Sequence, residues 1–343
     1  MTRRAAALAL LAVACRADPL PPAERYPAGT AYRAREVTAD GTRIRYVEAG
    51  RGPAVVMIHG FGASIYSWRH TIGPVVRAGF RVIAFDNRGF GFSGKPETGF
   101  TNADYVRLTV ALLDSLGVDD AVLVGHSMGG QIAAEVALAH PHRVRGLALL
   151  GAAGYGVQEP ALLYMARWPF VGPVVAGFRG RWSTGVILKS TYADPRKVTP
   201  ADVDQYYAPV AEPDYGAALR GVFREYQFDA LRGRMGAVRV PTLVLWGAHD
   251  GWIPPALGRR LAAELERVAF FMIAGAGHAV AEEAPDTTNR LLVTFLTEGL
   301  PRIPENLAWS TPSSLSSSSS SRSTPFTPPR SARSRASPAS TPS

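Results

Sequence analysis

The sequence has a single cysteine among its 343 residues, which excludes a scaffold held together by internal disulfides. Cys15 has no partner within the chain, and one thiol cannot form a cysteine cluster that binds a metal ion. Lysine is nearly as scarce, because three lysines stand among 37 basic residues and the others are arginines. Of the net charge of +9, +4 lies in residues 301–343, and the remaining +5 is spread along the chain without a Lys/Arg-rich run, so we expect no nucleic-acid partner.

Long hydrophobic segments are also missing. No stretch reaches the roughly 18 consecutive apolar residues that indicate a transmembrane helix. Near the N-terminus, the apolar run Ala5–Ala14 follows Arg3 and Arg4 and precedes Cys15. Because this run is too short to cross a membrane, its position after a positive start predicts an export signal over residues 1–15.

Two interpretations of the end of this signal remain open. Ala12-Val13-Ala14 fits an ordinary signal-peptidase site, after which the chain would be exported without lipid. The same residues resemble a bacterial lipoprotein box, in which Cys15 receives lipid, although lipoproteins usually have Leu where Ala12 stands. We expect a cell-envelope protein, anchored to a membrane through Cys15 or exported without an anchor, with a linker at 16–34. An uncleaved cytoplasmic N-terminus is the third interpretation.

The C-terminal residues 300–343 differ in composition from the rest of the chain. They are rich in Ser, Pro, Thr and Arg, and Ser316–Ser321 is an unbroken serine run. Phe326 is the only aromatic residue after Trp309, so burial cannot offset the entropy lost on ordering. We predict a disordered tail, with a basic tether to anionic lipid or cell wall as the alternative.

Between these ends, short apolar runs alternate with segments of helical periodicity. With 47% hydrophobic residues, the chain can form a large buried core. Asp40-Gly41 between two extended segments predicts a hairpin. Buried strands are predicted at Ala54–Ile58, Arg81–Asp86, Ala121–Val124, Val144–Leu150, Thr242–Trp246 and Val268–Ile273. Helices are predicted at 66–78, 102–116, 128–140, 256–265 and 284–298.

The alternation of strands and helices predicts an α/β fold, with a mostly parallel central sheet and helices on both faces. It lapses between Gly151 and Gly236, where prolines and aromatic residues accumulate in helical segments. We therefore predict a core at 35–151 and 236–299, interrupted after the sixth strand by an inserted helical cap at 152–235.

The motif Gly125-His126-Ser127-Met128-Gly129 lies between a predicted strand and a predicted helix. A serine hydroxyl is a poor nucleophile unless it is exposed, oriented and paired with a base. A sharp strand-to-helix turn would expose Ser127 in a strained backbone conformation, and glycines two residues before and after it would avoid the resulting clashes. The motif therefore predicts Ser127 as a catalytic nucleophile.

A second loop, His59-Gly60-Phe61-Gly62, follows the strand Ala54–Ile58. A tetrahedral oxyanion needs two backbone N–H donors close to the nucleophile. We expect the N–H groups of Phe61 and Met128 to form this oxyanion hole, since glycines beside Phe61 allow the backbone to approach closely.

The base and the acid that orients it are expected downstream. His278 follows the last predicted strand on a glycine-rich loop, which suits an active-site position. Asp250 lies just beyond the strand Thr242–Trp246. The rival position for the acid, after Val144–Leu150, has no carboxylate before Glu159, so Asp250 is preferred.

Residues from about 35 to 299 resemble the α/β-hydrolase family. The resemblance rests on the motifs above, on the chain order Ser127, Asp250, His278, on the turn Asp86–Ser93, and on Glu283-Ala284-Pro285 after the histidine. It implies a Ser-His-Asp triad that uses no metal or organic cofactor. Dehalogenases and epoxide hydrolases of the family have an aspartate nucleophile where this chain has Ser127, so the resemblance implies a serine hydrolase.

For the reaction, we expect hydrolysis of a small apolar carboxylic ester through an acyl-enzyme intermediate. Carbon–carbon bond hydrolysis and perhydrolysis by the same triad are alternatives, as is a non-catalytic binding protein on this fold. Carbon–carbon hydrolases of ring-cleavage products commonly have Trp after the catalytic histidine, where this chain has Ala279.

Trp252, two residues after Asp250, is a candidate for the substrate pocket or for simple packing. Phe223 and other cap aromatics are expected mostly in the core, with one or two lining a substrate cleft.

Overall fold

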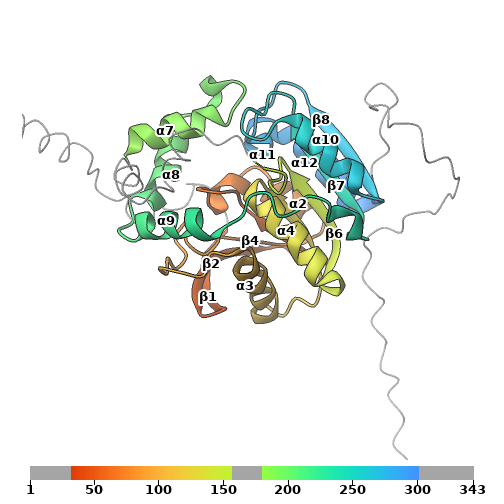
Figure 1. The fold of residues 1–343 in the computed structure, drawn as a ribbon, viewed down its shortest axis with the longest axis horizontal. Coiled ribbons are helices and arrows are strands. Elements are labelled where there is room, and N and C mark those ends of the chain that lie inside the picture. The colour runs from red at the N-terminus through yellow and green to blue at the C-terminus, as the bar shows by residue number, and fades with distance from the viewer. Residues whose placement is uncertain (1–31, 157–179, 301–343) are drawn as a thin grey trace, which may run out of the picture.

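The computed structural model describes residues 32–156 and 180–300 (Figure 1). The predicted export signal with Cys15, most of the linker and the predicted tail after residue 300 lie outside the described residues, and those predictions remain untested. Among the described helices, none is both long enough and apolar enough to cross a membrane.

The strands that the structure describes form one eight-stranded sheet. They are β1 (Ala34–Ala39), β2 (Thr42–Ala49), β3 (Ala54–Ile58), β4 (Arg81–Phe85), β5 (Ala121–His126), β6 (Val144–Leu150), β7 (Thr242–Gly247) and β8 (Val268–Ile273). Their order is β1-β2-β4-β3-β5-β6-β7-β8, with β2 antiparallel to both neighbours and every other pair parallel. The predicted strands and the mostly parallel sheet are confirmed.

The first hairpin follows from its turn residues. Asp40 and Gly41 both have positive φ values, 45° and 69°. Two positive φ angles give a turn whose twist matches that of the flanking strands, and an Asp-Gly pair adopts them most readily. β1 therefore pairs with β2 in the register predicted by this turn, with Ala39 opposite Thr42.

Helices follow most of the strands. They are α2 (Ile72–Arg77), α3 (Asn102–Ser115), α4 (Met128–Ala139), α7 (Arg181–Ser190), α8 (Pro200–Val210), α9 (Tyr215–Glu225), α10 (Pro255–Glu264), α11 (Val280–Glu283) and α12 (Pro285–Glu298). The prediction of one helix at 66–78 is wrong, because that segment forms a short 3₁₀ helix, η2 (Ile65–Trp68), and then α2. Pro74 explains the break, since a proline ring clashes with the carbonyl four residues earlier and is tolerated only in the first turn of a helix.

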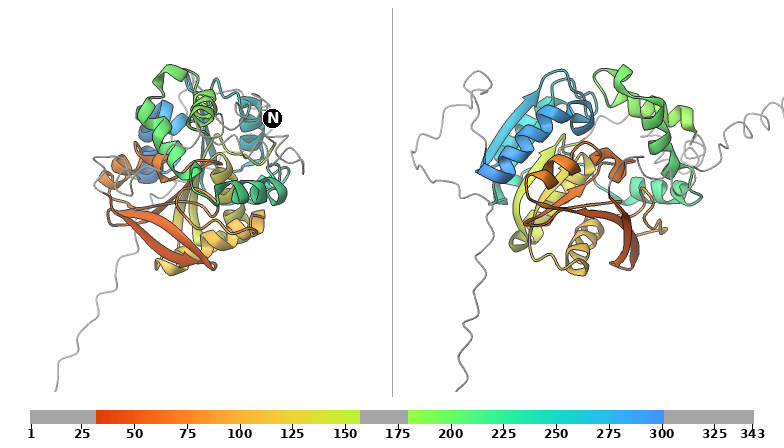
Figure 2. Two further views of the ribbon diagram at one scale, coloured as in Figure 1. Left: turned by 90° about the vertical axis from the view of Figure 1, so that its left-hand side faces the viewer. Right: turned by 180° about the vertical axis from the view of Figure 1, so that it is seen from behind.

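The two faces of the sheet bury separate hydrophobic clusters. Val56 and Ile58 of β3 face a cluster with side chains of α3, α4 and α10. Val55 and Met57 face the opposite cluster, which contains side chains of α2 and α12. Figures 1 and 2 show these helices on the two sides of the sheet. Successive side chains of a strand point to opposite faces, so an uninterrupted apolar run such as β3 fits a sheet that is covered on both sides.

The strand order places several loops at one edge of the sheet. The connection from β3 leads to β4 on one side, whereas β5 lies on the other side of β3. In open α/β sheets, ligands bind outside the carboxyl ends of the strands at such a reversal of order. The loops after β3, β5, β7 and β8 all leave the sheet at this edge, because these strands are parallel.

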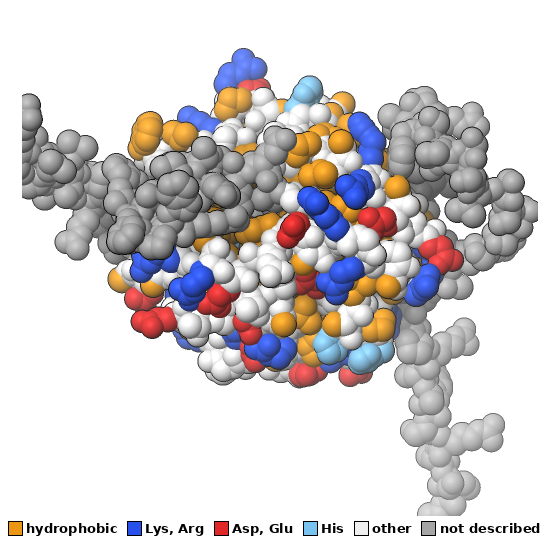
Figure 3. All heavy atoms as spheres, in the orientation of Figure 1, with side chains coloured by type: hydrophobic (Ala, Val, Ile, Leu, Met, Phe, Trp, Pro, Cys, Tyr) orange, Lys and Arg blue, Asp and Glu red, His pale blue; other side chains and the backbone are white. Residues whose placement is uncertain are grey.

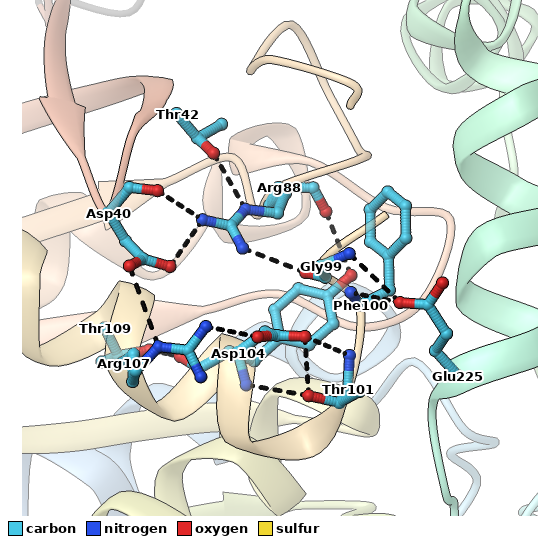
Figure 4. Close-up of polar contacts among 11 residues, drawn as sticks. Asp40, Thr42, Arg88, Gly99, Phe100, Thr101, Asp104, Arg107, Thr109 and Glu225 are labelled. Atoms are coloured by element: carbon cyan, nitrogen blue, oxygen red, sulfur yellow. Dashed lines mark hydrogen bonds and ion pairs between the residues drawn. The ribbon is translucent and has the colours of Figure 1, made fainter. Parts of the chain in front are cut away.

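The chain between β6 and β7 (residues 151–241), hereafter the insertion, contains α7, α8 and α9, and the predicted helical cap falls within it. One of its attachments is drawn in Figure 4. At the end of α9, the carboxylate of Glu225 accepts hydrogen bonds from the backbone N–H groups of Gly99 (3.1 Å) and Phe100 (2.9 Å). These bonds attach the C-terminal part of the insertion to a loop of the core.

Arg88 lies beside this attachment and has a structural role. Its guanidinium donates to Thr42 Oγ1 at 2.9 Å, to Asp40 Oδ2 at 2.7 Å and to the carbonyl of Gly99 at 3.0 Å (Figure 4). Asp86 accepts from the backbone N–H groups of Ile65 and Phe92. The turn after β4 therefore organises the core. The side chains of Asp86 and Arg88 are hydrogen-bonded to groups of the same chain.

A second attachment of the insertion is an ion-pair network. The guanidinium of Arg69, just after η2, pairs with Asp202 of α8 at 2.9 Å and also with Glu282 of α11. Tyr206 of α8 donates to Glu282 Oε1 at 2.5 Å. Burial raises the pKa of Glu282. This network joins α8 to the short helix that follows His278.

The molecular surface has charges of both signs. On the face shown in Figure 3, Lys and Arg side chains alternate with Asp and Glu side chains, and apolar side chains lie between them. Among the side chains that Figure 3 draws in colour, the basic ones do not form a continuous stripe.

Candidate active site

Ser127 occupies the sharp turn between β5 and α4. Its backbone has φ 54° and ψ −120°, and Asp40 is the other described non-glycine residue with positive φ. A Cβ atom on Gly125 would lie 2.3 Å from the carbonyl oxygen of Gly129, and one on Gly129 would lie 2.1 Å from the carbonyl oxygen of Ile58. Because neither position has room for a side chain, the glycines around Ser127 permit the turn as the motif predicts.

The loop after β3 packs directly against this turn. A Cβ atom on Gly60 would lie 3.1 Å from Cβ of Ser127. His59 fixes the loop, because its Nε2 accepts from the backbone N–H of Asn87 at 2.9 Å and its Nδ1–H donates to the carbonyl of Gly60 at 2.7 Å. Complete burial lowers the pKa of His59, so the neutral ring is the stable form. His59 therefore holds the loop after β3 in place through hydrogen bonds to two backbone groups.

The two amides predicted to form an oxyanion hole have no acceptor within the described residues. Neither the N–H of Phe61 nor that of Met128 donates to a group in 32–156 or 180–300. Met128 is the first residue of α4, where helix geometry leaves N–H groups without an intrahelical partner. Two such donors beside a serine are the arrangement that stabilises an oxyanion.

Asp250 and His278 form a buried pair at the ends of β7 and β8. The Nδ1–H of His278 donates to Oδ2 of Asp250 at 2.8 Å, and both residues are 4% exposed. The other carboxylate oxygen, Oδ1, accepts from the backbone N–H groups of Trp252 (2.9 Å) and Ile253 (2.8 Å). The acid is therefore held in one orientation and fixes the tautomer of the imidazole.

The rival position for the acid lies next to the same imidazole. A Cβ atom on Gly151, directly after β6, would be 3.3 Å from His278 Nδ1 and 3.4 Å from Asp250 Oδ2. The ends of both strands thus reach the histidine, and in this chain the β7 loop supplies the carboxylate.

His126 connects His278 to the turn of Ser127. Nε2–H of His126 donates to the backbone carbonyl of His278 at 2.9 Å, and the two ring centroids are 4.8 Å apart. Burial, together with the neighbouring His278, lowers the pKa of His126 to about 3. His278 is therefore held beside the residue that precedes Ser127, while no hydrogen bond between the Ser127 and His278 side chains is present in the described part of the chain.

Trp252 lies against the histidine and against the insertion. Its indole ring stacks on His278 with a centroid distance of 6.0 Å and an angle of 13° between the ring planes. Its Nε1–H donates to Ser190 Oγ at the end of α7, at 3.2 Å. Trp252 and Phe61 also pack against Phe223 of α9. An apolar wall of core and insertion side chains thus forms next to His278, and a role of Trp252 in a substrate pocket stays a prediction.

The sequence pattern did not indicate the role of two further residues. Ser190 contacts Trp252, and Glu283 binds the loop that carries His278. The only signal was the position of Glu283 in the segment Glu283-Ala284-Pro285.

Within 32–156 and 180–300, no three His, Cys, Asp or Glu side chains are grouped so as to hold a metal ion.

Comparison with known proteins identifies both a family and individual relatives. A family profile described as alpha/beta hydrolase fold matches residues 53–285. The chain is 30% identical over 265 residues to a 2-hydroxy-6-oxo-6-phenylhexa-2,4-dienoate hydrolase of Comamonas testosteroni, an alignment that covers 74% of this chain and 91% of the relative.

Solved structures show the same architecture. A meta-cleavage product hydrolase from Pseudomonas fluorescens IP01 matches with a TM-score of 0.67 and 27% identity, covering 76% of this chain and 96% of the other. A membrane phospholipase A, described as a bacterial virulence factor, matches with a TM-score of 0.64 and 26% identity, covering 84% of this chain and 91% of the other. Both structures support the assignment of the fold.

Proposed function

Because the chain belongs to the alpha/beta hydrolase fold family, we propose that it is a serine hydrolase in which Ser127 attacks a carbonyl carbon of a small molecule. The observation that carries this proposal is the buried His278–Asp250 pair beside the strained turn of Ser127. A binding protein would have no physical need for a strained serine next to an oriented imidazole.

The arrangement assigns a role to each group. His278 has its Nδ1 proton bonded to Asp250, so Nε2 is the nitrogen that is free to accept the proton of Ser127. The charged imidazolium that forms is stabilised by the Asp250 carboxylate. The N–H groups of Phe61 and Met128 donate to the oxyanion as the carbonyl oxygen gains charge. As the tetrahedral intermediate collapses, the bond to the leaving group breaks, the leaving group takes the proton from His278, and an acyl-enzyme on Ser127 remains. Water activated by His278 then hydrolyses this acyl-enzyme.

For the substrate, we propose a ring-cleavage product in which a C–C bond next to a ketone is hydrolysed. The similarity to meta-cleavage product hydrolases supports this reaction more than simple ester hydrolysis. Attack on such a ketone breaks a C–C bond when the departing carbon can hold the electron pair as a conjugated enolate. This proposal reverses the preference that the sequence motifs alone suggested.

Carboxylic ester hydrolysis is the second candidate. Two observations favour it: Ala279 follows His278 where C–C hydrolases commonly have Trp, and a membrane phospholipase A has a similar structure. The apolar wall of Phe61, Phe223 and Trp252 suits an apolar acyl group as well as an aromatic ketone.

The two candidates are separated by a direct comparison of rates. Protein that lacks residues 1–15 is assayed with 2-hydroxy-6-oxo-6-phenylhexa-2,4-dienoate and with p-nitrophenyl esters of graded chain length, and Ser127→Ala is the control. We expect kcat/KM for the dienoate to be higher by about tenfold or more, corresponding to at least about 1.4 kcal/mol of transition-state stabilisation. The reverse preference would make the protein an esterase. No turnover of either substrate, together with no labelling of Ser127 by a fluorophosphonate, would contradict the serine hydrolase proposal itself.

We also propose that the protein is located in the cell envelope, on the basis of the signal-like residues 1–15 alone. If Cys15 carries lipid, the mature protein partitions into detergent, and Cys15→Ser releases it or blocks its processing. Recovery of the wild type wholly in an aqueous periplasmic fraction with an unmodified Cys15 would favour export without an anchor.

A further inference from the structure

The end of α7 lies directly against the loop that carries His278. The backbone N–H of Ala279 donates to the carbonyl of Thr191 at 3.1 Å. A Cβ atom on Gly277 would lie 2.6 Å from the backbone nitrogen of Ala193, so the two backbones touch. Both neighbours of His278 in the sequence therefore contact the same short segment of the insertion.

A single carboxylate binds the two backbones together. Oε2 of Glu283 accepts from the N–H of Gly277 at 2.7 Å and from the N–H of Ala193 at 2.8 Å, while Oε1 accepts from the N–H of Asp194 at 2.8 Å. The side chain of Glu283 is 0% exposed. Lys197 lies on the same carboxylate, with Nζ 3.7 Å from Oε1.

These contacts use both oxygens of the Glu283 carboxylate as hydrogen-bond acceptors. A buried charge is tolerated when it is paired and hydrogen-bonded, and three N–H groups with one ammonium group meet that condition. An amide has one accepting oxygen, and its NH₂ group can only donate. A glutamine at position 283 would therefore turn donors toward at least one of the backbone N–H groups that Glu283 now binds.

We propose that Glu283 is a positioning residue that couples the insertion to the catalytic histidine. The inference rests on the proposed function, in which His278 is the base. Glu283 fixes the backbone on the N-terminal side of His278, and the carbonyl of Thr191 fixes it on the C-terminal side. A displacement of the segment Thr191–Asp194 moves the backbone of His278, and a displacement of about 1 Å at a catalytic group lowers the rate by up to about a hundredfold.

The neighbouring Glu282 supplies a matched control. It is also a buried carboxylate of α11 that joins the core to the insertion, but its side chain binds Arg69 and Tyr206 and not the loop of His278. Replacing Glu282 disturbs the attachment of the insertion in general, whereas replacing Glu283 removes its contact with Gly277 as well.

The test measures the rate of covalent labelling of Ser127 by a fluorophosphonate in the full chain, for the wild type, Glu283→Gln, Glu283→Asp and Glu282→Gln. Melting temperatures and circular dichroism establish which variants are folded. We expect Glu283→Gln to be labelled about ten- to a hundredfold more slowly than the wild type, and Glu282→Gln to stay within about threefold. With substrate, the loss should fall on kcat rather than on KM, since Glu283 does not contact the substrate.

Several results would overturn the positioning role of Glu283. A folded Glu283→Gln that is labelled at the wild-type rate overturns the positioning role. Equal slowing in Glu283→Gln and Glu282→Gln also overturns it, because a loosened insertion then explains both. If Glu283→Gln does not fold, Glu283→Asp keeps the charge but shortens the reach, and a wild-type rate in that variant has the same meaning. Failure of the wild type to be labelled at all would instead contradict the proposed function.

Discussion

The indole ring of Trp252 stacks on the imidazole of His278, with 6.0 Å between ring centroids and 13° between ring planes. The same carboxylate holds both residues, because Asp250 accepts from Nδ1–H of His278 through one oxygen and from the backbone N–H of Trp252 through the other. Asp250 therefore orients the histidine directly, and it also positions the ring that covers one face of the imidazole.

This relationship predicts the behaviour of Trp252 variants. Trp252→Leu removes the stacked ring, and we expect kcat/KM to fall by roughly tenfold, about 1 kcal/mol from lost ring contact and the remainder from a less restrained imidazole. Trp252→Phe keeps a stacking ring but loses the hydrogen bond to Ser190, so it should stay within about threefold of the wild type. Ser190→Ala is the control for the hydrogen bond alone. Equal losses in the Leu and Phe variants would mean that the stack has no kinetic role.

Two replacements of Ser127 separate its chemistry from its backbone strain. Ser127→Ala and Ser127→Gly should both lose activity by about 10³-fold or more, because each lacks the nucleophilic oxygen. They should differ in stability, since φ is 54° at this position and glycine adopts positive φ without the steric penalty. We expect Ser127→Gly to unfold with a free energy about 1 kcal/mol higher than Ser127→Ala, as measured by urea denaturation. A less stable glycine variant would show that the turn is not strained.

Asp250→Asn tests the tautomer of His278. The asparagine carbonyl can still accept the N–H groups of Trp252 and Ile253, but its NH₂ group then faces Nδ1 of His278 and donates to it. The ring proton is thereby moved to Nε2, the nitrogen that must accept the serine proton. We expect kcat to fall by about 10²- to 10⁴-fold with a small change in melting temperature. Near-normal turnover would show that Asp250 is not the orienting acid.

The lowered pKa of His126 predicts that the protein loses stability in acid. Its pKa falls from an ordinary 6.5 to about 3 in the folded protein, so between these values the unfolded chain binds a proton that the native state does not. The free energy of unfolding is therefore unaffected by His126 well above pH 6.5. It decreases as the pH falls below this value, by up to about 3 kcal/mol at pH 4.5. The lowered pKa of buried His59 acts in the same direction.

The measurement compares urea denaturation of the wild type and His126→Gln from pH 7.5 to 4.5, because the glutamine amide reaches the position of Nε2. The variant keeps an amide donor for the carbonyl of His278 but cannot titrate, so its stability should fall less steeply with acid. Parallel pH dependences in the two proteins would mean that His126 titrates normally in the native state.

Much of the site could be predicted locally. The turn of Ser127 is predictable because a strand, a glycine-flanked turn and a helix follow one another in a few residues, and steric exclusion of side chains at Gly125 and Gly129 is a property of that turn itself. Phe61 and Met128 followed in the same way from loops directly after β3 and β5. The predicted helix at 66–78 is wrong because apolar periodicity alone does not show the break that Pro74 imposes.

Contacts between distant segments have no such local pattern in the sequence. The sequence favours Asp250 over the end of β6 because no carboxylate is present there, yet a Cβ atom on Gly151 would lie 3.3 Å from His278 Nδ1. The stacking of Trp252 could not be separated from simple packing, because it depends on how the loops after β7 and β8 meet. The hydrogen bonds from Glu283 to the insertion had no sequence signal beyond a family-like segment.

The sequence by itself determined most of the strand and helix pattern, the mostly parallel sheet and the glycine-flanked turn of Ser127, because these depend on the periodicity and backbone limits of neighbouring residues. Only the tertiary structure decided which groups surround His278. Asp250, Trp252, His126 and the end of α7 meet there because the strand order sets β7 between β6 and β8 and brings the insertion over the same edge. Such contacts arise from the packing of whole elements, which no short stretch of sequence encodes.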